Sequence, residues 1–212
     1  MPTGVHLPNA RELLFEAAER VLARDGVSGL TSRAVTTEAG VAKGVMHRHF
    51  VDFDAFLAEL ILDRAAQLEG AASALRDSAG TGTVVGNLAD ALTAVFTPLA
   101  LAMVALVITR DGLRARLRET RAARFPLIAE GSAMVTAYLT EEQALGRVAA
   151  TADIPTLSPT LVGSVHLLFT NRESGFPDAE ALHKVVKTVM RDLITDNRHA
   201  PRRRASRESR RE

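Results

Sequence analysis

Residues 30–50 read LTSRAVTTEAGVAKGVMHRHF and hold two short helix-length segments around a tight turn. The first, about 32–38, follows Thr31, whose hydroxyl can accept a hydrogen bond from the free backbone N–H groups of a new helix. Gly40 suits the positive φ at which many helices end. A second segment, about 42–50, follows the turn. The spacing predicts a helix-turn-helix, whose second helix can enter the major groove of DNA.

The composition favours helices over sheets. The chain has 212 residues, enough for one or two domains, and neither Cys nor Trp. Without cysteine there is no disulfide framework, no thiolate metal site and no cysteine nucleophile. Ala and Leu are abundant, which indicates an all-α fold. We expect a cytoplasmic protein, because a reducing compartment fits and the opening residues do not form a signal peptide.

The net charge is distributed unevenly along the chain. Residues 198–212 hold seven Arg and two Glu, a local charge of +5, whereas the whole chain carries +1, so residues 1–197 carry about −4. The basic character therefore belongs to the tail, and a DNA-binding hypothesis has to depend on the motif. The tail is expected to be disordered, either as a solvated arm or as a non-specific contact to DNA phosphates.

The order of signals along the chain predicts four regions. Residues 1–8 resemble a flexible arm, and 9–25 form an amphipathic helix with Asn9 as N-cap and Glu12 completing a capping box. Asp52 should cap a long helix that begins at Phe53 and ends near residue 76. Further helices are expected near 84–97, 98–110, 112–145, 157–173 and 178–197. The predicted domains are a helix-turn-helix DNA-binding head (9–52), a helical ligand-binding and dimerisation body (53–197) and an Arg-rich tail (198–212).

One apolar run needs a decision between membrane and core. Leu99 to Ile108 is almost wholly apolar, but a membrane span needs about 20 predominantly apolar residues. Asp90 and Pro98 interrupt the run upstream, and Arg110 ends it downstream. A core helix buried on most sides is therefore the preferred interpretation, and no membrane contact is expected.

The opening helix, the quoted stretch and the Asp-led helix that follows together resemble the N-terminal domain of TetR-family transcriptional regulators. The resemblance is close over about 9–60 and architectural beyond. It implies an all-α homodimer with a DNA-binding head and a larger body that binds a small ligand. The function implied is that of a repressor which a small hydrophobic ligand releases from a palindromic operator, without a cofactor.

The resemblance also implies which residues contact DNA. Thr31 and Arg33 match positions that meet the phosphate backbone, and Lys43 matches a basic residue near phosphate and base edges. Gly44 lets the helix approach the groove, and Val45 can meet a thymine methyl. The full set of expected DNA contacts is Thr31, Arg33, Ala42, Lys43, Gly44, Val45, His47, Arg48 and His49.

Several of these positions depart from the family pattern. Ala42 replaces a capping Ser or Thr, His47 stands where Tyr is usual, and Phe53 stands where Lys is common. These losses leave an alternative open, namely a helical ligand-binding or interaction protein whose head no longer binds DNA.

Catalysis has no residue-level support, so an enzyme is not expected. His47 and His49 point about 200° apart on a helix and cannot chelate one metal. Glu180 and His183 form a Glu-x-x-His of the di-iron type, but such sites need two copies and further carboxylates, which makes a di-iron enzyme a distant third hypothesis.

The body offers apolar faces for a ligand and for a second copy of the chain. Helices near 157–173 and 178–197 should meet a twofold mate as a four-helix bundle, which implies an inverted-repeat operator on double-stranded DNA. Simple core packing is the competing explanation for each candidate ligand contact. These candidates are Phe96, Leu99, Met103, Leu106, Phe125, Ile128, Met134, Tyr138, His166 and Phe169.

Overall fold

The computed structural model describes residues 9–120, 123–170 and 177–195, and over these ranges it is all-α, as predicted. The expected arm (1–8) and Arg-rich tail (198–212) lie outside the described residues. The helices are α1 (Ala10–Gly29), α2 (Ser32–Glu38), α3 (Lys43–His49), α4 (Phe53–Asp77), α5 (Val84–Val95), α6 (Pro98–Thr109), α7 (Asp111–Glu119), α8 (Pro126–Ala144), α9 (Ile154–Thr170) and α10 (Ala179–Val189).

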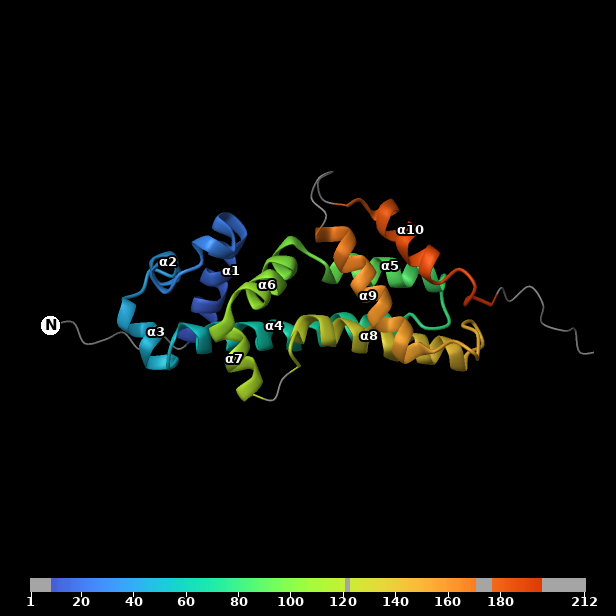
Figure 1. Cartoon of the computed structure of the whole chain (residues 1–212), viewed down its shortest axis with the longest axis horizontal. Helices are drawn as coiled ribbons and strands as arrows, with labels where there is room; N and C mark the ends of the chain where they lie inside the picture. The colour runs from blue at the N-terminus through green and yellow to red at the C-terminus, as the bar shows by residue number, and fades with distance from the viewer. Residues whose placement is uncertain (1–8, 121–122, 171–176, 196–212) are drawn as a thin grey trace, which may run out of the picture.

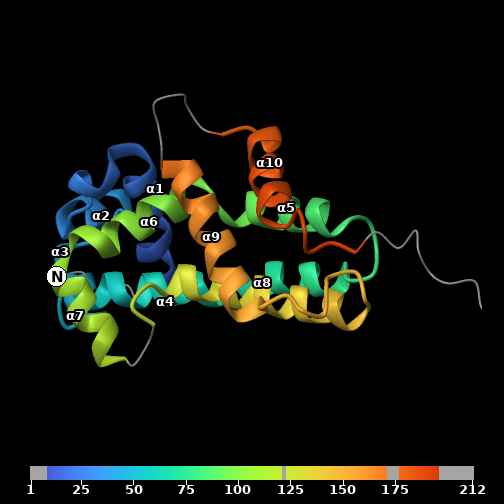
Figure 2. The same ribbon diagram turned by 45° about the vertical axis from the view of Figure 1, so that its right-hand side comes forward.

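The helices form an elongated molecule with α3 at one end (Figure 1). Helix α4 runs along much of its length, and α8 lies beside it. Turning the molecule shows α9 crossing over α8, with α10 and α5 together on the far side from α4 (Figure 2). Helix α3 and the pair α5 and α10 therefore lie toward opposite ends of the long axis of the molecule.

Two hydrophobic clusters share α4. The first unites α1, α2 and α3 with the N-terminal half of α4, and it extends into α6 and α7. The second unites the C-terminal end of α4 with α5, α8, α9 and α10. Helices α6 and α7 thus pack in the same core as the head, although they belong to the segment that we assigned to the body.

The prediction of one helix over 112–145 was wrong. Helix α7 ends at Glu119, and α8 begins at Pro126. Proline has no N–H to donate to a preceding turn and disfavours helical φ and ψ at the residue before it. Phe125 accordingly adopts φ −130° and ψ 83°, and Pro126 starts a new helix in its first turn.

Two helix ends also differ from expectation. Asn9 makes no side-chain cap to α1, so the predicted capping box with Glu12 is absent. The last helix was expected to reach residue 197, but α10 ends at Val189. The chain then turns, and Ile194 pairs with Val148 in an isolated antiparallel bridge.

Helix α6 is the apolar run weighed above as core or membrane span. Leu101, Met103, Val104, Leu106 and Val107 on this helix are buried. Over the described ranges, no single helix is both long and apolar enough to cross a membrane, and α5 and α6 meet that test only as a pair bent by 66°.

Candidate nucleic-acid interface and the cavity behind it

The α2–α3 unit is built by local hydrogen bonds that the sequence indicated. Thr31 Oγ1 accepts from the Ala34 N–H at 3.1 Å and so caps α2, as predicted. Gly40 has φ +67°. The N–H groups of Gly40 and Val41 donate to Thr37 O (3.1 Å) and Thr36 O (3.0 Å), the pattern of a Schellman turn. This turn fixes the direction in which α3 leaves α2.

The inner face of α3 is held by aromatic packing. Met46 and Phe50 are buried. The Phe50 ring meets Phe56 of α4 edge-on at 5.0 Å and lies 6.0 Å from Phe15 of α1, measured between ring centroids. Ser32 Oγ also donates to Met46 Sδ at 3.2 Å, which ties α2 to α3. The orientation of α3 therefore follows from side chains of three neighbouring helices.

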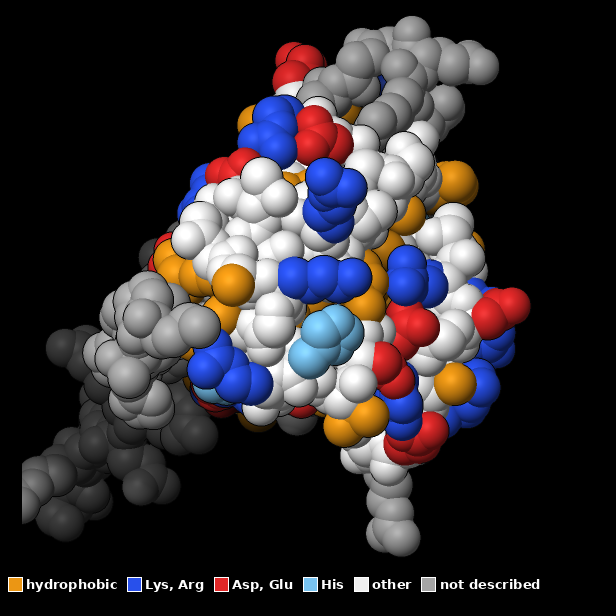
Figure 3. All heavy atoms as spheres, turned by 90° about the vertical axis from the view of Figure 1, so that its left-hand side faces the viewer, with side chains coloured by type: hydrophobic (Ala, Val, Ile, Leu, Met, Phe, Trp, Pro, Cys, Tyr) orange, Lys and Arg blue, Asp and Glu red, His pale blue; other side chains and the backbone are white. Residues whose placement is uncertain are grey.

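The outer face of α3 is exposed and cationic. Lys43, Gly44, His47, Arg48 and His49 are all exposed, as are Ala42 before the helix and Thr31 and Arg33 at the start of α2. Figure 3 looks onto this end of the molecule and shows Lys, Arg and His side chains spread across it. Eight of the nine expected DNA contacts thus lie on the surface at one end of the molecule.

Val45 differs from the expectation. Its side chain is only 7% exposed and belongs to the core of the head. Val45 precedes buried Met46 on the inner side of α3, so it does not face outward to meet a thymine methyl. Ala42, in turn, makes no side-chain cap to α3, in agreement with its departure from the family pattern.

An ion-pair cluster supports the start of this surface from behind. Glu38 at the end of α2 pairs with Arg24 and Arg20 of α1, each at 2.8 Å. Hydrogen bonds from Arg24 and then Arg20 lower the pKa of Glu38. Arg24 and Glu38 line a shallow groove beside Thr31 and Arg33. Arg24 is already paired with Asp25 and Glu38, whereas Arg33, the other cation of this groove, forms no ion pair within the described ranges.

Ion pairs join the start of α4 to α7 and to the residue after α6, a feature that the sequence analysis did not predict. Asp52 Oδ1 caps α4 by accepting from the Ala55 N–H at 2.7 Å, as predicted, while its Oδ2 pairs with Arg116 of α7. Hydrogen bonding from Arg116, followed by that from the Ala55 N–H, lowers the pKa of Asp52. Asp54 pairs with Arg110, which follows α6 directly.

Phe53 fits into the same junction. The Arg110 guanidinium lies 5.2 Å from the Phe53 ring centroid, and Phe53 stacks on Phe56 at 5.6 Å. The residue that replaces the family's usual lysine therefore joins the head to α6 rather than extending toward a phosphate. The sequence carries no local signal for this junction, because Arg110 and Arg116 lie 56 and 64 residues away from Asp54 and Asp52.

A small apolar cavity lies between α5, α6, α8 and α9. Its volume is about 20 Å³, enough for about one water molecule. Of the ten candidate ligand contacts, Phe96, Ile128 and His166 line it. Burial lowers the pKa of His166, and its Nδ1 has no hydrogen-bond partner within the described ranges. The neutral imidazole is thus the polar group of an otherwise hydrophobic space.

The other seven candidates do not converge on this cavity. Leu99, Met103, Leu106 and Phe125 pack in the first hydrophobic cluster. Met134, Tyr138 and Phe169 pack in the second, where Tyr138 also accepts a hydrogen bond from Asn87 at 3.0 Å. Core packing, the competing explanation, accounts for these side chains in the structure described.

The apolar stripes expected to meet a second subunit are also turned inward. Seven apolar residues of the two predicted helices are buried against other helices of the same chain, namely Leu161, Val162, Val165, Phe169, Leu182, Val186 and Met190. On the outer side of α9, Leu167 is 69% exposed. Any second copy would therefore meet the outer faces of these helices.

Neither histidine pattern gathers into a metal site. Across the part of the chain that the structure describes, no group of three or more His, Asp or Glu side chains is arranged to hold a metal ion.

Comparison with known proteins agrees with this geometry. Residues 14–60 match the family model of bacterial regulatory proteins, tetR family. No curated protein is significantly similar in sequence. Among solved structures, reduced NemR from E. coli superimposes with a TM-score of 0.69 at 16% identity, covering 90% of this chain and 100% of that one.

Two further structures show the same fold. A putative TetR-family regulator from Mesorhizobium loti gives a TM-score of 0.63 at 16% identity, over 91% of this chain and 100% of its own. The multidrug binding protein EbrR, solved with imidazole, gives 0.61 at 20% identity, over 91% and 99%. The resemblance inferred from residues 9–60 is confirmed.

Proposed function

We propose that this chain, whose N-terminal head belongs to the TetR family of bacterial regulatory proteins, is a sequence-specific DNA-binding transcriptional regulator. The observation that carries the proposal is the exposed cationic face of α3, held rigidly by Phe15, Phe50 and Phe56 at one end of the molecule. Lys43 and Arg48 supply charge for phosphates, while His47 and His49 supply ring N–H groups for phosphates or base edges. Such a protein acts in the cytoplasm, where the DNA is.

We further propose a homodimer that binds an inverted-repeat operator. The proposed contact is the side of α9 and α10 that carries exposed Leu167, which is its apolar anchor. A twofold pair of heads can contact two half-sites about one turn of DNA apart. Replacing Leu167 with Arg should convert the dimer to a monomer in sedimentation velocity. An unchanged dimer would place the interface elsewhere.

A small hydrophobic ligand is proposed to release the protein from DNA, which makes it a repressor. The cavity beside His166 is too small for such a ligand, since binding sites usually measure about 300–1,000 Å³. Entry of a ligand therefore has to separate α6, α8 and α9. Movement of α6 would reach the head through Arg110 and Arg116, because these residues hold Asp54 and Asp52 directly after α3.

The test is fluorescence anisotropy with labelled duplex DNA from upstream of the chain's own gene. We expect saturable binding that weakens as salt rises and that exceeds binding to scrambled DNA. Lys43→Ala should weaken binding, whereas Arg76→Ala, which removes a positive charge in the last turn of α4, outside the head and the proposed dimer contact, should not. If the wild type binds no DNA selectively, the protein is the alternative, a helical ligand-binding protein with an inactive head.

A further inference from the structure

A second cationic surface lies on the body, in a groove between α10 and the turn from α4 to α5. The groove has a volume of about 730 Å³. The turn contributes Gly80 and Gly82, and Arg147 approaches from the connection between α8 and α9. Helix α10 and the residues after it contribute His183, Lys187, Arg191 and Ile194, and α5 adds Val84 and Val85.

Three basic side chains of this segment line the groove. His183 and Lys187 are four residues apart and therefore lie on one side of α10, and Arg191 lies in the turn that follows the helix. All three are exposed, whereas Leu182 and Val186 on the inner side are fully buried. No Asp or Glu lines the groove, and neither Lys187 nor Arg191 has an ion pair with any residue in the described ranges.

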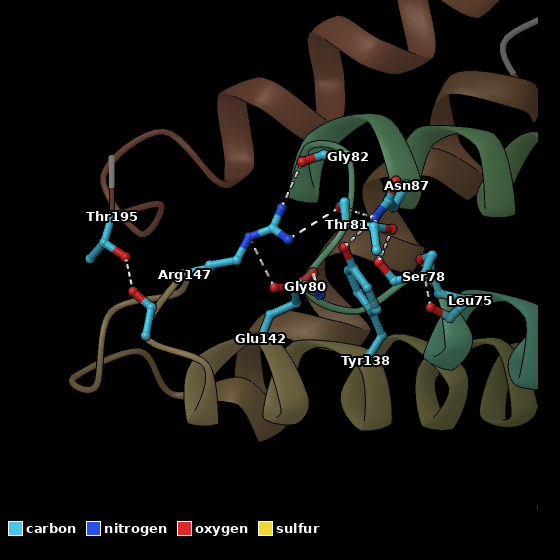
Figure 4. A network of polar contacts seen from close by, with 11 residues as sticks. Leu75, Ser78, Gly80, Thr81, Gly82, Asn87, Tyr138, Glu142, Arg147 and Thr195 are labelled. Carbon is cyan, nitrogen blue, oxygen red and sulfur yellow. Dashed lines mark hydrogen bonds and ion pairs between the residues drawn. The ribbon is translucent and has the colours of Figure 1, made fainter. Parts of the chain in front are cut away.

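Polar contacts within the chain hold the walls of the groove in place (Figure 4). Arg147 donates to Thr81 O at 3.1 Å and to Gly82 O at 2.9 Å, and its Nε lies 3.3 Å from Glu142 Oε2. Glu142 is fully buried, and its Oε1 accepts from the Gly80 N–H at 3.3 Å. The α4–α5 turn is thus attached to α8 and to the connection that follows it.

The residues that follow α10 are attached to the same connection. The Thr195 N–H donates to Arg147 O at 3.0 Å, and the Ala149 N–H donates to Leu193 O at 2.8 Å. Since the donors of Arg147 are occupied by the chain itself, Lys187 and Arg191 are the cations left to hold a ligand's charge.

We propose that this groove binds a small organic anion that carries an apolar body. A carboxylate or sulfonate head would lie between Lys187 and Arg191, and the apolar body would lie against Val84, Val85 and Ile194. The volume is in the range of about 300–1,000 Å³ typical of small-molecule sites. DNA is a poor fit, because α10 and the α4–α5 turn, which line the groove, lie toward the opposite end of the molecule from α3 (Figure 1). The site is distinct from the cavity beside His166 and does not depend on DNA binding by the head.

A matched pair of dyes tests the proposal. Anilinonaphthalenesulfonate is an anion with an aromatic body, and phenylnaphthylamine is its neutral counterpart. Because the chain has no Trp and one Tyr, its own fluorescence will interfere little. We expect the anion to bind wild-type protein and each of Lys187→Gln and Arg191→Gln to weaken its Kd about three- to fivefold, with the double variant weaker still. Affinity for the neutral dye should not change.

The control is Lys184→Gln, which removes the same charge from the same helix outside the groove. It should leave the Kd of the anionic dye within about twofold of wild type, a shift smaller than one exposed ion pair produces. Circular dichroism and sedimentation velocity establish that each variant keeps its helical content and oligomeric state. Equal dye affinity in wild type and double variant would overturn the proposal. A change of oligomeric state in the double variant would also overturn it, and would assign the groove to a subunit interface. A loss of DNA binding in the double variant alone would overturn it as well, and would assign the groove to nucleic acid.

Discussion

Two glycines in the head, Gly40 and Gly44, separate stability from DNA binding. Gly40 lies in the turn with φ +67°, and no atom lies within 4 Å of the Cβ that alanine would add. The cost of Gly40→Ala is therefore the cost of the left-handed conformation alone, about 1–2 kcal/mol. Gly44 is in the first turn of α3 with equally open space around it. There alanine should add about 0.5–1 kcal/mol of stability through helix propensity.

The DNA affinities should change in the opposite order. If the backbone of α3 approaches the major groove of DNA at Gly44, the methyl group of Gly44→Ala occupies space that the DNA needs. Overpacking of about 1–3 kcal/mol corresponds to a Kd that is about 5- to 150-fold weaker. Gly40→Ala leaves the outer face of α3 unaltered, so its Kd should stay within about threefold of wild type wherever both proteins are folded, a difference below 1 kcal/mol.

Thermal unfolding by circular dichroism and anisotropy titrations measure the two effects separately. A chain of this size shifts its midpoint by about 2–4 °C per kcal/mol, so Gly40→Ala should lower Tm by about 2–8 °C and Gly44→Ala should raise it by about 1–4 °C. The proposed approach of α3 to DNA is refuted if Gly44→Ala binds as tightly as wild type. The interpretation of the turn is refuted if Gly40→Ala is the more stable of the two.

Three more variants test the junction, the polar network and the cavity. Asp52→Asn keeps a capping oxygen but loses the ion pair with Arg116, at a cost of about 0.5–1 kcal/mol because both groups are partly exposed. The pKa of Asp52 is lower in the folded protein than its ordinary value of about 3.9, so this contribution to stability is complete above about pH 3.9 and disappears as pH falls through the folded-state pKa. The free energies of unfolding in urea of variant and wild type should therefore differ at neutral pH and converge in acid. Arg147→Met leaves the fully buried Glu142 carboxylate without its cation and should cost about 3–5 kcal/mol in the same assay; a loss below 1 kcal/mol would show that the pair contributes little. Gly131→Ala adds one methyl group from α8 at the cavity beside His166 and should weaken release from DNA by hydrophobic ligands while leaving DNA affinity intact; unchanged release would place the ligand elsewhere.

Local signals in the sequence were sufficient for most of the head. Thr31, Gly40 and Asp52 act within a few residues of their own positions, through caps and a turn whose geometry depends on nearby backbone atoms. Such interactions can be predicted without knowing the rest of the fold. The burial of Val45 could not, because it depends on how α3 is rotated against α1 and α4.

Long-range pairing explains what the sequence could not predict in the body. An apolar stripe on α9 or α10 indicates that something covers it, but not whether the cover is another helix of the same chain or a second subunit. In this structure the stripe of α9 packs against α8 and α10, and the stripe of α10 packs against α5 and α9. The pairs Asp52–Arg116 and Asp54–Arg110 join residues far apart in sequence, and nothing in their spacing distinguishes them from ordinary surface charges.

The attachment of residues 193–195 to 147–149 has a consequence for synthesis on the ribosome. The helices of the head come from the first third of the chain, whereas the second hydrophobic cluster needs Leu182, Val186 and Met190 and is closed by the bridge between Ile194 and Val148. Domains fold in the order in which they emerge. The helix-turn-helix is thus complete while the apolar faces of α5, α8 and α9 are still uncovered by α10, so the nascent chain passes through a stage in which the head is folded before the body.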